Sequence, residues 1–181
     1  TDAMGIAAGV PNGNATLRME GPWCDVMTGS TTPSMTSNIS GNPTVSFDAN
    51  STDRERTAFY HINIIHNFVK VPPTLTNFTT MDTTMNTIVD VSGSCNAYYN
   101  GNCNFYAAGG GCNATALLSD VIYHEYGHGL NYDIYTYYGQ NFSNGAMGEG
   151  YADLWGMSIY NYPIIGEGFY TANQSGIRRY D

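Results

Sequence analysis

The chain has 181 residues and a formal net charge of −9 at pH 7, with 15 acidic and only six basic side chains. This charge argues against a nucleic-acid partner and against an anionic membrane surface. No apolar run approaches the roughly 18 residues of a membrane span. A chain of this length forms one domain, or most of one, and buries about 70% of its unfolded surface.

Residues 1 to 50 carry repeated turn signals, among them Pro11-Asn12-Gly13 and Gly41-Asn42-Pro43, with short candidate strands between them. We therefore expect a β-rich N-terminal segment over residues 1–50 and a second unit over residues 51–181. The sequence starts at Thr1 with no signal-peptide pattern, and we expect a mature or trimmed form of the protein.

The second unit begins with a helical pattern and continues with a strand pattern. Apolar residues recur every three or four positions from Asp53 to Val71, which predicts a helix, and Pro72-Pro73 is expected to end it. Thr87–Val91 is rich in β-branched residues and predicts a strand. The chain therefore mixes helices and strands.

Four cysteines allow three complete pairings. They occur in a chain that is rich in Asn, Thr, Ser, Gly and Tyr and nearly devoid of Lys, a composition that favours a secreted protein. Among the pairings we favour a bridge from Cys95 to Cys103 and a second from Cys24 to Cys112. A cysteine-rich zinc site is the alternative, and it is disfavoured because no C-x-x-C is present.

The strongest motif is His124-Glu125-Tyr126-Gly127-His128, in a helix expected to start near Asn113 or Thr115 and to end at Gly129 or soon after. Two histidines four residues apart lie on one helix face, about one turn apart along the axis. Both rings can therefore reach one tetrahedral cation at about 2.0–2.1 Å. Glu125 points about 100° around the helix, beside the cation, where a general base for an activated water has to stand.

A catalytic zinc site with two histidines needs a third protein ligand, and a second predicted helix, from about Gly148 to Tyr160, supplies a candidate. Glu149 is the expected third ligand. Asp153, one turn further on, is expected to accept the other ring N–H of a ligating histidine and to fix its tautomer. The alternative is a helix with two surface histidines and unrelated acids, which the combined spacing of the four residue types disfavours.

These residues resemble a known family. His124–Gly129 and Gly145–Asp153 resemble the gluzincin metallopeptidases, and within that group the fungalysin-like and thermolysin-like secreted endopeptidases. Thr57–Phe68 resembles the helix behind their active site, and Asn96–Gly101 followed by Phe105–Gly111 resembles the edge strand that pairs with substrate. The resemblance implies an α+β zincin-type catalytic domain with a β-rich N-terminal lobe, an active-site helix, a ligand helix, and a C-terminal helical lobe that is largely absent.

The resemblance also implies an activity, that of a zinc endopeptidase in which Glu125 is the general base. Asn96 and Ala97 are expected to bind the main chain of a protein or peptide substrate, and Tyr138 is expected to stabilise the oxyanion. The family also uses a later histidine, but none follows His128. A missing C-terminal lobe or a propeptide is a further expected partner, and calcium is a possible second metal. The alternative is an inactive or incomplete zinc-binding domain with a binding or adhesion role, and the presence of Glu125 disfavours it.

Overall fold

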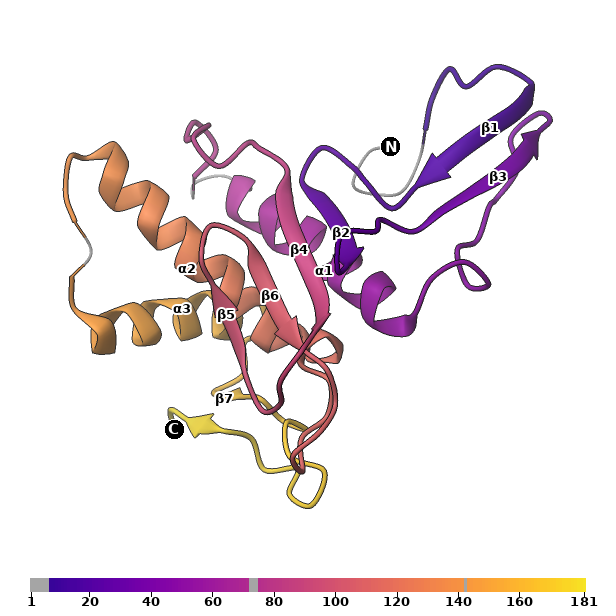
Figure 1. Ribbon diagram of the computed structural model, residues 1–181. Helices are drawn as coiled ribbons and strands as arrows, with labels where there is room; N and C mark the ends of the chain where they lie inside the picture. The colour runs from indigo at the N-terminus through magenta and orange to yellow at the C-terminus, as the bar shows by residue number, and fades with distance from the viewer. Residues whose placement is uncertain (1–6, 72–74, 142) are drawn as a thin grey trace.

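The computed structural model describes residues 7–71, 75–141 and 143–181 and has a mixed α+β architecture built on a four-stranded sheet (Figure 1). The order of strands in this sheet is β2-β4-β6-β5. Neighbouring strands among the first three run parallel, whereas β5 is antiparallel to β6 and forms one edge. The bounds of these strands are Cys24–Thr28 for β2, Met85–Val91 for β4, Cys103–Tyr106 for β6 and Ala97–Tyr99 for β5.

Two smaller antiparallel pairs flank the main sheet. Strands β1 (Gly13–Arg18) and β3 (Ser34–Ile39) form one pair, which lies at the opposite end of the molecule from α2 and α3 in Figure 1. Strands β7 (Ile164–Ile165) and β8 (Arg178–Arg179) form the other, near the end of the chain. Because β2 belongs to the main sheet, residues 1–50 contribute directly to it. The division at residue 50 stays a prediction.

Helix α1, Asp53–Lys70, packs its apolar face on the sheet. Its first turn is closed by a capping box in which the Glu55 amide donates to the Thr52 hydroxyl at 3.2 Å and the Thr52 amide donates to the Glu55 carboxylate at 2.7 Å. The predicted stop at Pro72-Pro73 lies outside the described residues. The core beneath α1 contains side chains that are fully buried, namely Val26, Ala58, Ile62, Ile65, Val69, Val89 and Phe105.

Helix α2 is longer than the sequence predicts. A short 3-10 turn, η1 (Thr115–Leu117), precedes it, and α2 then runs from Ser119 to Tyr137 instead of ending near Gly129. The helix continues because Leu130, directly after that glycine, is 1% exposed and packs in the core. None of the helices in the described ranges is long and apolar enough to cross a bilayer.

Helix α3, Gly145–Tyr160, packs along α2 (Figure 1). It begins at Asn144, whose side-chain oxygen accepts from the Met147 amide at 3.1 Å, and it ends at Asn161 in the left-handed region with φ 50°. The predicted second helix is therefore present, with a start three residues earlier than expected. The contact between α2 and α3 places the His124–His128 motif and the Glu149–Asp153 motif on neighbouring helices.

The cysteine pairing predicted from the sequence is wrong. Cys95 is joined to Cys112 with a Cα–Cα distance of 5.2 Å, while Cys24 and Cys103 are free thiols buried in the core. Strand register explains the difference, because β6 pairs Cys103 with Tyr99 and leaves Cys95 beyond the end of the strand. The two free thiols lie on β2 and β6, on opposite sides of β4, so about 10 Å separates their strands, beyond the roughly 7 Å that a disulfide can span.

Candidate metal centre

The two histidines of the motif converge as the helical spacing predicts. His124 and His128 lie one turn apart on α2, and their Nε2 atoms are 3.0 Å apart. Their rings meet edge to face with centroids 4.6 Å apart. The His124 side chain is 7% exposed and the His128 side chain 23% exposed, so the pair stands at the inner wall of a cleft that remains open to solvent.

Glu149 of α3 faces these two nitrogens. Its carboxylate oxygens lie 3.2 Å from His124 Nε2 and 3.5 Å from His128 Nε2. A tetrahedral ion with ligands at about 2.0–2.1 Å has its ligand atoms about 3.3 Å apart. The two ring nitrogens, 3.0 Å apart, are close to one edge of such a tetrahedron, and each carboxylate oxygen of Glu149 lies about one edge length from one of them, Oε2 from His124 and Oε1 from His128. The donor set therefore fits a zinc ion held by His124, His128 and Glu149.

The orientation of His124 is set from its other side by Asp153. His124 Nδ1–H donates to Asp153 Oδ1 at 2.6 Å, which leaves Nε2 facing His128 and Glu149. Burial lowers the pKa of His124, but its hydrogen bonds with Asp153 and Glu149 outweigh burial and raise the pKa to about 9. The metal-free ring is therefore protonated at neutral pH, and a cation has to displace the Nε2 proton.

The Asp153 side chain is 0% exposed, and two residues near the end of the chain satisfy its remaining lone pairs. Arg178 donates from Nε to Oδ2 at 2.5 Å and from Nη2 to Oδ1 at 2.7 Å. The Tyr180 hydroxyl donates to Oδ2 at 2.6 Å. Burial raises the pKa of Asp153, but the hydrogen bonds from His124, Arg178 and Tyr180 outweigh burial and hold it well below its usual range.

Sequence reasoning missed Arg178 and Tyr180. Neither belongs to the motif or to a periodic segment, and only the pair Arg178-Arg179, in a chain with six basic residues, stands out in the sequence. Their positions come from the pairing of β8 with β7, which brings Arg178 opposite Ile165 and toward α3. The part of the chain after α3 is therefore a wall of the site.

Glu125 lies beside the ligand atoms but has a different environment. It is 4% exposed, and its Oε2 atom has no hydrogen-bond partner among the described residues. Burial, followed by the charges of Glu149 and Asp153, raises its pKa to about 7 against the lowering effect of His124 and Arg178. An unpaired carboxylate oxygen on a group with a pKa near 7 suits a general base.

Glu125 could also be considered as the third ligand, because His124, Glu125 and His128 offer ligand atoms that all lie within 4.8 Å of one another. Glu149 fits better, because its carboxylate faces both ring nitrogens, with one oxygen 3.2 Å from His124 Nε2 and the other 3.5 Å from His128 Nε2. In the described part of the chain, no second such group of His, Cys, Asp or Glu side chains is found. For calcium, the possible second metal, the described residues therefore offer no ligand cluster of this kind.

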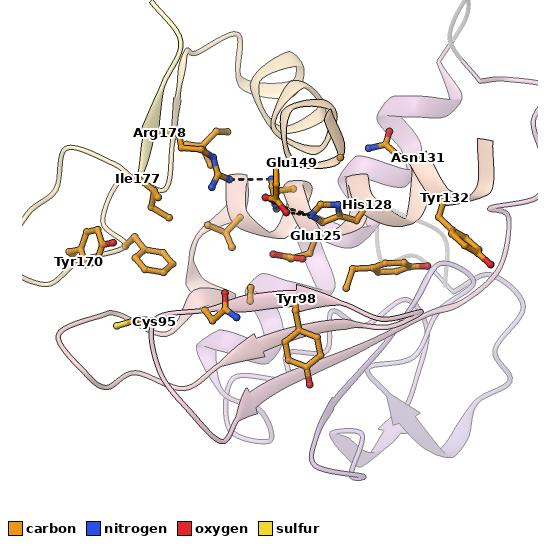
Figure 2. Close-up of a pocket in the computed structure, with 18 residues that line it drawn as sticks. Cys95, Tyr98, Glu125, His128, Asn131, Tyr132, Glu149, Tyr170, Ile177 and Arg178 are labelled. Atoms are coloured by element: carbon orange, nitrogen blue, oxygen red, sulfur yellow. Dashed lines mark hydrogen bonds and ion pairs between the residues drawn. The ribbon is translucent and has the colours of Figure 1, made fainter. Parts of the chain in front are cut away.

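A cleft of about 650 Å³ opens in front of these residues (Figure 2). One wall is the free edge of β5, where Asn96 and Ala97 line the cleft, and their predicted binding of the substrate main chain stays a prediction. The opposite wall comes from the segment after α3. The cleft also contains aromatic and apolar side chains that the motif does not include, namely Tyr98, Tyr99, Val121, Tyr132, Ile165, Phe169, Tyr170 and Ile177.

Tyr138 does not line this cleft. Its side chain lies at the C-terminal cap of α2, is 69% exposed and packs edge-on against Tyr137. Tyr132, one helical turn after His128, lines the cleft instead. The oxyanion role of Tyr138 remains a prediction that this geometry does not support.

Two helical glycines allow the close packing that positions the ligands. A Cβ on Gly127 would lie 2.9 Å from Trp155 Cδ1 and 3.2 Å from the Ala152 backbone of α3. A Cβ on Gly129 would lie 3.1 Å from the Tyr99 ring of β5. Glycine costs about 0.5–1 kcal/mol relative to alanine in a helix interior. That cost is offset by the approach of α3 and β5 to α2.

Comparison with known proteins gives a likeness of fold. No protein-family model matches the chain, and no curated protein matches it. Among solved structures, the chain is similar to the precursor of protealysin, a metalloproteinase from Serratia proteamaculans, with a TM-score of 0.55 and 15% identity. The match covers 93% of this chain and 53% of that one, so the chain spans about half the length of the precursor. The expected metallopeptidase-like α+β fold is confirmed at this level, and the finer resemblance to fungalysin-like and thermolysin-like enzymes stays a prediction.

Proposed function

We propose that the chain is the catalytic part of a zinc-dependent endopeptidase. The observation that carries the proposal is the convergence of the His124 and His128 Nε2 atoms and the Glu149 carboxylate, all within 3.5 Å of a neighbour, in a cleft bounded by an open strand edge. A structural zinc site needs neither an unpaired buried carboxylate beside it nor a peptide-sized cleft. Both are present, and they support catalysis.

Each residue of the site has a role in this proposal. His124, His128 and Glu149 hold the zinc ion, and Asp153 keeps the His124 ring in the ligating orientation. Bound there, zinc acts as a Lewis acid that acidifies water and polarises the scissile carbonyl. Glu125 accepts a proton on its free carboxylate oxygen and returns it to the leaving amine. Arg178 and Tyr180 keep Asp153 ionised.

The proposed substrate is a protein or an extended peptide. Strand β5 is hydrogen-bonded to β6 on one side only, and its other side faces the cleft. Backbone groups on such an edge bind an extended peptide as an additional strand, which would place its scissile bond beside the zinc ligands. Asn96 and Ala97, at the start of β5, are the proposed contacts for the substrate main chain.

We also propose that the protein is secreted. The Cys95–Cys112 disulfide supports this, because disulfides persist mainly in oxidising compartments. Since the similar solved structure is a precursor, a propeptide is a further proposed partner, together with additional chain that would complete the cleft.

The test is hydrolysis of a mixed peptide library by the zinc-loaded protein, its Glu125→Gln variant and a Glu20→Gln control. Glu20 is exposed and pairs with Arg18 at the end of β1, so the control makes the same chemical change away from the residues that line the cleft. Glu125→Gln should bind one zinc ion and cleave at least about 100-fold more slowly, because the general base is lost. The control should cleave like the parent.

Two results would overturn the proposal. Equal cleavage by the parent and Glu125→Gln would remove the role of Glu125. Zinc binding by both proteins with no cleavage by either would favour the alternative, a zinc-binding domain with a binding role.

A further inference from the structure

The Cys95–Cys112 disulfide connects the start of the cleft's edge strand to a surface loop whose Cys112 side chain is buried. Cys95 immediately precedes Asn96 and itself lines the cleft, whereas Cys112 is 2% exposed. The loop around Cys112 is a tight turn in which the Gly109 amide donates to the Cys112 carbonyl at 3.0 Å and the Cys112 amide donates to the Gly109 carbonyl at 2.9 Å. The disulfide therefore joins the start of β5 to a hydrogen-bonded turn.

The same loop holds the opposite wall of the cleft. The Thr171 amide donates to the Gly111 carbonyl at 2.9 Å, and the Asn113 amide donates to the Phe169 carbonyl at 2.9 Å. The Asn113 side chain adds a bond from Nδ2 to the Gly168 carbonyl at 2.7 Å. Phe169 lines the cleft, so residues 111–113 position that wall directly.

A third connection reaches the edge strand from η1. The Thr115 hydroxyl, on a residue that is 0% exposed, donates to the Asn96 carbonyl at 3.0 Å. Cys95 is thus held by a disulfide to Cys112, and Asn96 is held by a hydrogen bond from Thr115. In Figure 2, Cys95, Tyr170 and Ile177 gather at one end of the cleft, where the two walls meet.

We propose that these residues, Cys95, Cys112, Asn113 and Thr115, form a positioning hub that sets the separation of the two walls of the cleft. The inference rests on the proposed peptidase function and deepens it. The metal ligands lie on α2 and α3, and the close contact of these helices at Gly127 and Ala152 involves none of the hub residues. The hub therefore controls the affinity for the extended substrate and leaves zinc binding and the chemical step intact.

The test compares four zinc-loaded proteins in steady-state peptide hydrolysis. These are the oxidised parent, a Cys95→Ala/Cys112→Ala double variant, an Asn113→Ala variant that keeps the disulfide, and a Cys24→Ala control that removes a buried free thiol. The double variant should raise KM about tenfold with kcat within about threefold of the parent, because uniform binding is lost. Asn113→Ala should raise KM by a smaller factor, and Cys24→Ala should leave KM unchanged.

Brief treatment of the parent with a phosphine, followed by its removal, provides a version that needs no substitution. Each disulfide takes up two electrons and two protons and becomes two thiols, while the phosphine becomes its oxide with oxygen from water. The reduced parent should reproduce the KM of the double variant and still bind one zinc ion. This arm keeps the test decisive if the double variant fails to fold.

Amide hydrogen exchange separates failure of the hub from failure of the proposed function. Loss of the disulfide should accelerate exchange in residues 96–106 and leave α2 unchanged. Unchanged KM and unchanged exchange in this hairpin would overturn the hub, and so would a fall in kcat accompanied by loss of zinc. If the oxidised parent cleaves no peptide, the proposed function fails, and the exchange experiment alone decides whether the hub positions the strand.

Discussion

Replacing Gly127 with alanine tests whether helix packing sets the geometry of the metal centre. A Cβ at this position would lie 2.9 Å from Trp155 Cδ1 and 3.2 Å from both the Cα and the carbonyl oxygen of Ala152. The indole can turn, but the Ala152 backbone belongs to α3 and yields only if the two helices separate. Glu149 and Asp153 lie on the same helix, so this separation moves two groups of the site away from α2.

The magnitude follows from two opposing terms. Overpacking a close contact costs about 1–3 kcal/mol, and removing a helical glycine returns about 0.5–1 kcal/mol. We expect Gly127→Ala to lower the free energy of unfolding of the metal-free protein by about 1–2 kcal/mol. Its zinc affinity should fall as well, because Glu149 is displaced from the two ring nitrogens.

The matched control is Gly150→Ala. Gly150 is also helical, but a Cβ there would meet nothing within 4 Å, so this change should stabilise the protein by about 0.5–1 kcal/mol. Urea unfolding at pH 7 in a chelator measures both stabilities, and competition with a zinc-binding dye measures the affinities. If Gly127→Ala is stabilised as much as Gly150→Ala and binds zinc like the parent, the close approach of α2 and α3 does not position the ligands.

Two further predictions follow from buried polar groups. Asp153→Asn should lower the free energy of unfolding, measured with urea at pH 7, by about 2–3 kcal/mol. This is less than the roughly 3–5 kcal/mol lost when a fully buried ion pair is broken, because the Arg178 side chain is 36% exposed. A loss no larger than that of Asp181→Asn, a control at an exposed site, would refute this prediction. Burial lowers the pKa of His61 to about 4, and its Nδ1 accepts from the Tyr123 hydroxyl at 2.5 Å. The stabilisation by neutral His61 is therefore present above pH 6.5 and lost as the pH falls through 4. The parent should lose about 1 kcal/mol more than His61→Phe across this range, a value reduced for solvent screening at this partly exposed ring, and parallel urea-derived profiles would contradict this.

Local spacing predicted the part of the site that lies on one helix. His124 and His128 share a face because an i, i+4 pair does so in any α-helix, whatever surrounds it. Glu149 and Asp153 were predicted because a second acidic motif occurs at a spacing that resembles a known family. The structure brings all four residues together, and their catalytic and ligating roles remain for experiment to establish.

Features that depend on strand register and on neighbouring elements were not predictable in the same way. The cysteine pairing failed because sequence separation carries no information about where β5 begins opposite β6, and that register leaves Cys95 facing Cys112. The end of α2 was placed too early because glycine is costly in a helix taken alone. At Gly129 that cost is offset by contact with Tyr99, which is distant in sequence.

The hydrogen-bonding requirement of Asp153 explains why the end of the chain belongs to the site. A fully buried carboxylate has about four acceptor positions, and one histidine N–H satisfies only one of them. With His124 as its only donor, an ionised Asp153 would be too costly to bury, so its pKa would rise. A protonated Asp153 would no longer favour the ligating orientation of His124. A cation and further donors are therefore required, and the described structure supplies them from Arg178 and Tyr180. The motif shows that a partner for Asp153 has to exist, and only the pairing of β7 with β8 shows which residues provide it.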